Sequence, residues 1–166
     1  MLSTIEIGRG EFGFSAAHAG LHDGEFESLH GHTFQVTLRL SGIPADDGML
    51  IDFGEVKTAL REAIAPLRRR TMMPGRAPDV LITSENDSLS IVAGRKRYVL
   101  PTEDVVVLPL VNTTSEAIAD YLLDRALPYL HGCGLTTVEP SQLVGQRRRG
   151  AGLSDRHLGT GAAGLR

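Results

Sequence analysis

Apolar and polar residues alternate most regularly between residues 33 and 40. The even-numbered positions are apolar and the odd-numbered positions are polar, as in a β-strand that buries one face. The apolar set is Phe34, Val36, Leu38 and Leu40. Residues 2–18 alternate more loosely, and their even positions from residue 12 are Phe12, Phe14, Ala16 and His18. The pattern therefore predicts two strands, each with one face against a core.

Two further segments carry helix start signals. Asp52 is a good N-cap with a glutamate three residues later, which predicts a helix from there to about Leu67. Thr113 and Glu116 repeat this capping box, and the apolar spacing that follows predicts a second helix to about Tyr129. Both helices have an apolar stripe that can pack on a sheet.

The rest of the chain consists of short strands and a tail. Residues 79–109 contain four short β-like runs separated by polar turns, which predict an inserted β-hairpin region. After the second helix, L-T-T-V-E predicts a last strand ending at Glu139. Residues 146–166 are rich in glycine and poor in large apolar groups, so we expect a mobile C-terminal tail. The prediction is one α+β domain over residues 1–145, followed by this tail.

Composition narrows the class of protein. The chain has 166 residues, 42% of them hydrophobic, which suits a single core. A net charge of -3 argues against nucleic acid or an anionic membrane as partner. One cysteine excludes an intrachain disulfide, and no apolar run approaches the roughly 20 residues of a membrane span. Because the N-terminus has no signal-like segment, we expect a cytoplasmic protein.

The segment E-S-L-H-G-H-T-F contains the most informative motif. Side chains at positions i and i+2 of a strand share a face, so His30 and His32 can reach one point. His18 ends the neighbouring strand on the matching face and is the obvious third ligand. Three imidazoles with one open position suit a catalytic zinc ion. The competing interpretation is a group of histidines that only pack and form hydrogen bonds.

Five motifs together resemble a known enzyme family. They are F-S-A-A-H, L-H-G-H-T-F-Q-V-T-L, G-M-L-I-D-F-G-E-V-K, N-T-T-S-E-A-I-A and a late V-E. In this order, over about residues 10 to 140, they are similar to the family of 6-pyruvoyl-tetrahydropterin synthase and 6-carboxytetrahydropterin synthase. The resemblance implies the tunnelling fold (T-fold), a four-stranded antiparallel sheet with two helices on one face. It also implies a homo-oligomer, typically a hexamer.

The resemblance implies a chemistry and a set of site residues. Family members use zinc to polarise the side-chain hydroxyls of 7,8-dihydroneopterin triphosphate. Glu139 matches the glutamate that grips the pterin ring, while Thr114 and Glu116 fall on a second ring-lining stretch, although helix capping also explains Glu116. The residues that match the family's zinc ligands are His18, His30 and His32.

The sequence departs from the family at two places. The cysteine that serves most members as general base is missing before H-G-H, and Arg68 to Arg70 stand where a Leu-Asp-His motif is expected. Some members have a glutamate three residues before the first histidine, which is the position of Glu27 here. Glu27 is therefore the candidate base, against the alternative of a solvated loop glutamate. The arginines are either triphosphate ligands or a solvated helix end.

These observations predict a zinc-dependent lyase that acts on the side chain of a dihydropterin. One alternative is side-chain cleavage to 6-hydroxymethyl-dihydropterin, which the glutamate at position 27 favours through the resemblance. A second alternative is a cyclase or lyase with a non-pterin substrate. A third is a pterin-binding paralogue with reduced activity, which the missing cysteine, aspartate and histidine favour.

Overall fold

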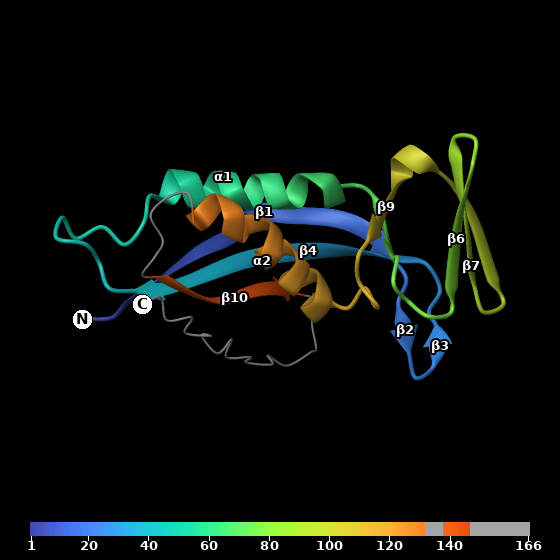
Figure 1. Ribbon diagram of the computed structural model, residues 1–166, viewed down its shortest axis with the longest axis horizontal. Coiled ribbons are helices and arrows are strands. Elements are labelled where there is room, and N and C mark those ends of the chain that lie inside the picture. Colours follow the sequence, from blue (N-terminus) through green and yellow to red (C-terminus); the bar gives the residue numbers. More distant parts are fainter. Residues whose placement is uncertain (132–137, 147–166) are drawn as a thin grey trace, which may run out of the picture.

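A computed structural model describes residues 1–131 and 138–146 of the chain. Most of the predicted C-terminal tail, residues 147–166, lies outside the described residues, as does the segment 132–137. The protein is an α+β fold with a long central sheet, two helices and two smaller sheets at one end (Figure 1). Neither described helix is long and apolar enough to cross a membrane.

The central sheet is mixed and has five strands in the order β10-β4-β1-β5-β9. Strand β4 (His30–Gly42) pairs antiparallel with both β1 (Ser3–His18) and β10 (Val138–Gln146). The short strands β5 (Thr71–Pro74) and β9 (Val105–Leu108) continue the sheet in parallel beside β1. The expectation of a four-stranded, wholly antiparallel sheet is therefore wrong: the sheet has five described strands, and β5 and β9 are parallel to β1 because the chain after the first helix returns in the direction of β1.

The register of β1 and β4 confirms the alternating pattern. Phe14 lies opposite Phe34, and the even positions are buried from residue 12 in β1 and from residue 34 in β4, whereas before residue 12 the odd-numbered Ile7 is buried. A bulge between Gly8 and Gly13 shifts the register. A Cβ atom at Gly8 would lie 2.7 Å from the Cα atom of Thr37, so glycine permits the close approach of the strands before the bulge.

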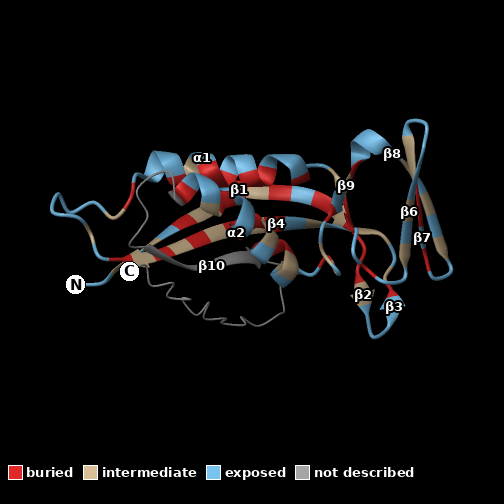
Figure 2. Ribbon diagram, viewed as in Figure 1, coloured by how far each residue is buried: buried red, intermediate tan, exposed pale blue. Residues whose placement is uncertain are grey.

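Both helices lie on one face of the central sheet (Figure 1). Helix α1 (Phe53–Ile64) is capped as predicted by Asp52, whose carboxylate accepts from the Gly54 and Glu55 N–H groups, and a 3-10 turn η1 (Ala65–Leu67) continues it. The buried residues of α1 face the sheet and its outer face is exposed (Figure 2). Helices and sheet enclose the main core, which includes Leu38, Leu60 and Leu122.

Helix α2 (Ser115–His131) begins one residue later than its predicted cap requires. The cap is Thr114, whose hydroxyl accepts from the Ala117 N–H at 3.2 Å. The predicted capping box of Thr113 and Glu116 is therefore wrong. Thr113 is buried and its hydroxyl is bonded instead to groups at the end of β1.

The last strand was predicted to end at Glu139, whereas β10 runs from Val138 to Gln146. The residues before Val138 lie outside the described part of the chain. Beyond Glu139 the strand crosses a register shift at Pro140 and Gln142 and continues along β4. Apolar alternation is weak in this segment, which explains why its extent could not be predicted.

The predicted insertion forms a separate three-stranded antiparallel sheet rather than a simple hairpin. Its strands are β6 (Val80–Glu85), β7 (Ser88–Ala93) and β8 (Lys96–Pro101), after which η2 (Thr102–Asp104) leads into β9 of the main sheet. It stands at the same end of the molecule as a hairpin of β2 (Leu21–His22) and β3 (Glu25–Phe26) (Figure 1). A second, smaller apolar cluster joins the two, with Phe26 and Ile91 among its buried members.

Candidate metal centre

The three histidines predicted as ligands meet at the end of the β1–β4 ladder. His18 is the last residue of β1 and lies directly opposite His30, the first residue of β4. His32 follows two positions later, opposite Ala16, and therefore shares the face of His30. The alternation that buries the core thus also places all three imidazoles on one side of the sheet.

The imidazole rings form a nearly equilateral triangle. The distances between ring centroids are 4.6 Å for His18 and His30, 5.1 Å for His18 and His32, and 4.8 Å for His30 and His32. One ring nitrogen from each lies within 4.8 Å of the other two. A zinc ion bound by all three nitrogens would lie roughly 2.1 Å from each of them. The nitrogens are close enough to one another for small ring rotations to reach that arrangement.

Hydrogen bonds select the nitrogen that each of two rings offers. The Thr113 hydroxyl donates to the Ala19 carbonyl at 2.9 Å, so it can only accept from Nδ1–H of His18, 3.3 Å away. Nδ1–H of His30 donates to the Ser28 carbonyl at 2.7 Å. In both rings Nε2 therefore keeps its lone pair. In metal-binding histidines, one ring nitrogen binds the metal and the N–H of the other donates a hydrogen bond in this way.

The surroundings of His18 keep it neutral. Burial, together with the neighbouring His30 and His32, lowers the pKa of His18 from 6.5 to about 4. Its Nε2 atom is buried and has no hydrogen-bond partner among the described residues. A buried acceptor without a partner is costly unless something occupies it, and a neutral imidazole is the form that binds metal. The residues thus fit a divalent ion bound by three nitrogens, with zinc as the typical choice for this donor set.

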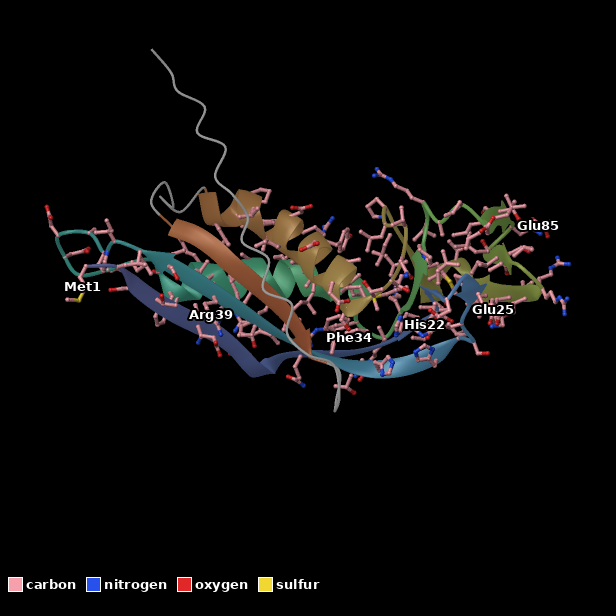
Figure 3. The ribbon with its side chains drawn as sticks, turned by 90° about the horizontal axis from the view of Figure 1, so that it is seen from below. Met1, His22, Glu25, Phe34, Arg39 and Glu85 are labelled. Atoms are coloured by element: carbon pink, nitrogen blue, oxygen red, sulfur yellow. The ribbon has the colours of Figure 1, made fainter. Side chains whose placement is uncertain are left out.

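Aromatic rings close the inner side of the triangle. The Phe34 ring lies edge-on to His18 at 5.7 Å and to His32 at 6.1 Å, and it stacks on Phe14 at 5.0 Å. Figure 3 shows Phe34 on the same side of the molecule as His22 and Glu25, with Arg39 farther along β4. The candidate metal position therefore has an apolar aromatic ring next to two of its three imidazoles.

Glu27 lies between the hairpin and β4, close to the histidines. Its side chain is half-buried, and its charge acts on His18 in the direction that raises the pKa of that ring. Its backbone N–H donates to the Gly20 carbonyl at 2.8 Å. Glu25, two residues earlier in β3, is exposed. Glu27 is thus less exposed than Glu25 and close enough to His18 for its charge to act on that ring.

The predicted ring-binding residues are spread more widely. Thr114 and Glu116 are exposed at the start of α2, directly after the Thr113 that contacts His18. Glu139 pairs with Ser41 near the far end of β4, about 30 Å of strand away from His32. Within one chain, Thr114 and Glu116 therefore follow directly after a residue that contacts the triad, whereas Glu139 lies far from it.

Arg68, Arg69 and Arg70 form the turn that links η1 to β5. The Arg69 N–H donates to the Ser15 carbonyl at 2.8 Å, and the Arg70 carbonyl accepts from the Ala17 N–H at 3.0 Å. Arg69 has a φ of 57°, which is uncommon for a residue other than glycine. None of the three guanidinium groups forms an ion pair with a described residue.

Sequence reasoning missed the residues that support the site. Thr113 was predicted to cap α2. The motif N-T-T contains two threonines, and since Thr114 is the cap, the hydroxyl of Thr113 is available to contact His18. Asn112 was not noticed; its amide accepts from the Leu21 N–H at 2.9 Å and donates to the Leu21 carbonyl at 2.8 Å. No local signal reveals such contacts, because their partners lie more than 90 positions away in the chain.

The chain matches the model of one protein family, 6-pyruvoyl tetrahydropterin synthase, over residues 7–142. It belongs to this family. The triangle of His18, His30 and His32 is consistent with the metal site of this family. The family assignment also identifies the chain as a pterin lyase of the T-fold class.

Two proteins with similar sequences carry the same name. A Methanocaldococcus jannaschii protein named "Putative 6-carboxy-5,6,7,8-tetrahydropterin synthase" is 28% identical over 126 residues, which are 75% of this chain and 77% of that protein. A Pyrococcus abyssi protein of the same name is 32% identical over 62% of this chain and 63% of its own length.

Solved structures of the family have the same fold. Plasmodium falciparum 6-pyruvoyl tetrahydropterin synthase superposes with a TM-score of 0.79 at 22% identity, covering 89% of this chain and 99% of that chain. A Plasmodium vivax 6-pyruvoyltetrahydropterin synthase in which a catalytic glutamate is changed to alanine has a TM-score of 0.73 at 26% identity, covering 89% and 98%.

Proposed function

We propose that this protein is a zinc-dependent lyase that acts on the side chain of 7,8-dihydroneopterin triphosphate or a closely related pterin, in the manner of 6-carboxytetrahydropterin synthase. The observation that carries the proposal is the triangle of His18, His30 and His32 in a chain of this family. When bound, the zinc ion supplies Lewis acidity to the side-chain oxygens of the substrate, which acidifies the adjacent C–H and O–H groups.

Glu27 is the proposed general base. It is half-buried beside the triad, and an ionised carboxylate there can accept the proton that the substrate side chain releases. The Plasmodium vivax enzyme supports this role, because a glutamate is named as its catalytic residue. The same residue favours a second candidate function, side-chain cleavage to 6-hydroxymethyl-dihydropterin, since the resemblance associates that product with a glutamate at this position.

Glu139 is the proposed ligand of the pterin ring, because one carboxylate can accept from two adjacent ring N–H groups. Its backbone lies far along β4 from the triad of its own chain. The role therefore requires a homo-oligomer in which Glu139 serves the metal centre of a neighbouring copy. Thr114 and Glu116, exposed beside the triad, are proposed to line the same cavity from the chain that holds the metal.

Metal analysis tests the first part of the proposal. Purified protein should contain about one zinc ion per chain, and the His32→Ala variant should lose it because two imidazoles hold zinc weakly. The matched control is His22→Ala, since His22 is exposed in β2 and lies outside the triad. Full zinc content in His32→Ala would contradict the assignment of the site.

Product analysis tests the second part. Wild-type protein incubated with 7,8-dihydroneopterin triphosphate should release 6-carboxytetrahydropterin, identified by chromatography and mass spectrometry. Release of 6-hydroxymethyl-dihydropterin would establish the second candidate instead. Tight pterin binding without any product would identify a binding paralogue, and neither binding nor turnover would indicate a non-pterin substrate.

A Glu27→Gln variant tests the base. Glutamine keeps the shape of the side chain but cannot accept the proton, so turnover should fall by about 100-fold or more. Zinc content should stay at the wild-type level. Glu25→Gln is the control, because Glu25 is exposed in the adjacent strand and should be dispensable. Wild-type turnover by Glu27→Gln would exclude Glu27 as the base.

A further inference from the structure

The backbone around Glu27 is held by the inserted sheet. The Phe26 carbonyl accepts a hydrogen bond from the ammonium group of Lys96, and the Leu29 N–H donates to the Tyr98 hydroxyl at 3.3 Å. These two contacts lie on either side of Glu27, and both come from β8. A strand about 70 positions later in the chain therefore fixes the segment 26–29.

The geometry of β8 explains why two residues reach the same segment. Lys96 and Tyr98 are two positions apart, so they project from one face of the strand, and both are half-buried. Arg97 lies between them on the opposite face and is exposed. Tyr98 pairs with the buried Ile91 of β7, and both belong to the apolar cluster that includes Phe26.

Other hydrogen bonds complete the fixation of this segment. The Glu27 N–H donates to the Gly20 carbonyl, and the Ser28 carbonyl accepts from Nδ1–H of His30. Backbone groups that lack such partners are satisfied by water, which leaves a loop free to move. Four consecutive residues are therefore each hydrogen-bonded through the backbone: Phe26 and Leu29 to β8, Glu27 to Gly20, and Ser28 to His30 of the triad.

We infer that Lys96 and Tyr98 are positioning residues for Glu27, and that the inserted three-stranded sheet holds this carboxylate at its working distance from the metal centre. The inference rests on the proposed function only in giving Glu27 the role of base. A base must be placed accurately, since a displacement of about 1 Å can reduce the rate by about 100-fold. Neither Lys96 nor Tyr98 touches the substrate in this assignment.

A Tyr98→Phe variant of the full chain tests the inference, because it removes the hydroxyl and keeps the packing of the ring. We expect kcat to fall about tenfold with KM and zinc content unchanged, and the Leu29 amide to exchange faster with solvent. Lys96→Met should have a similar effect, and Lys96→Arg should restore most of the activity because it retains a donor. Arg97→Met, on the exposed face, is the matched control and should behave as wild type.

A double variant separates positioning from general destabilisation. If Tyr98 acts through Glu27, adding Tyr98→Phe to Glu27→Gln should cost no further activity, whereas an unrelated structural effect would add its full cost. Additive losses, or an unchanged Leu29 exchange rate in Tyr98→Phe, would overturn the inference. Full activity of Tyr98→Phe beside an inactive Glu27→Gln would overturn the positioning role alone. Full activity of Glu27→Gln would overturn the base assignment on which that role rests.

Discussion

At the scale of single residues, the hydroxyl of Thr113 sets the orientation of a proposed metal ligand. It donates to the Ala19 carbonyl and accepts from His18, so it binds both the end of β1 and the imidazole that this strand carries. Partners of this kind hold the ring angle and the tautomer of metal-binding histidines. Thr113 is almost fully buried, which removes competition from water.

Replacing Thr113 by valine should weaken metal binding. Valine fills the same volume but leaves Nδ1–H of His18 and the Ala19 carbonyl without their partner. We expect zinc affinity to fall by about 10- to 100-fold, measured by competition with a chromophoric chelator. Thr113→Ser retains the hydroxyl and should bind zinc nearly as well as wild type. Equal affinity in the valine and serine variants would show that this hydrogen bond does not support the site.

The residues that carry the site differ in how far sequence could predict them. His18, His30 and His32 followed from strand parity, and the structure brings them together. The role of Thr113 was not predicted, because a threonine before a helix satisfies a capping pattern whether or not it caps. Long-range contacts such as that of Tyr98 with the Leu29 backbone have no local signature at all.

At the scale of elements, the start of α1 depends on one side chain. The Asp52 carboxylate accepts from two N–H groups of the first turn that have no partner within the helix. The main core receives one face of this helix, including Val56 and Leu60. A substitution that removes this cap should therefore lower the stability of the fold without changing the candidate metal centre.

Asp52→Ala should lower the free energy of unfolding by about 1 kcal/mol, because alanine cannot cap the helix. The measurement is chemical denaturation monitored by circular dichroism. Asp52→Asn is the control and should be close to wild type, since asparagine caps as well as aspartate. Zinc content should be unchanged in both variants. A loss of similar size in Asp52→Asn would point to charge rather than capping as the cause.

The elements that were predicted and those that were not differ in their physical signals. Strands β1 and β4 and helix α1 have long periodic patterns, and the structure confirms them. Strand β5 has only four residues and is buried on both faces at its two methionines, so it shows no alternation. The β2–β3 hairpin was missed although its Asp23-Gly24 turn, with both φ values positive, is a strong hairpin signal.

At the scale of the whole molecule, the part of the chain that the structure describes has two apolar cores of unequal size. The large one lies between the helices and the central sheet, and the small one joins the insertion to the β2–β3 hairpin. Opening free energies follow the amount of buried apolar contact, so the two regions should differ in local stability. The candidate metal centre lies at the end of β1, just before the chain enters the β2–β3 hairpin of the smaller region.

Hydrogen exchange should resolve these two regions. In metal-free protein we expect amides of β7 to exchange faster than amides of β4, because the smaller core can open without the larger one. Added zinc should slow exchange in the hairpin more than in α1. Uniform exchange across β4 and β7 would show that the molecule opens only as one cooperative unit.

The fold class was predictable through family resemblance more than through pattern, but the mixed sheet was predicted by neither. Alternation and capping predict strands and helices but not their order in a sheet, and the parallel pairing of β5 and β9 was not foreseen. Parallel pairing depends on the path of the connecting chain, which no local pattern encodes. The matched family supplied the architecture, and the structure supplied the register that places the histidines.

The distance between Glu139 and the histidine triangle along β4 has a consequence for the active species. If this carboxylate holds the ring whose side chain lies on the metal, the smallest working unit contains more than one polypeptide. Specific activity should then fall when the enzyme is diluted below the concentration at which subunits separate. Two inactive variants, His18→Ala and Glu139→Ala, should also recover part of the turnover when their subunits are exchanged. In some mixed assemblies the intact histidine triad of the Glu139→Ala subunit then meets the intact Glu139 of the His18→Ala subunit in one active site.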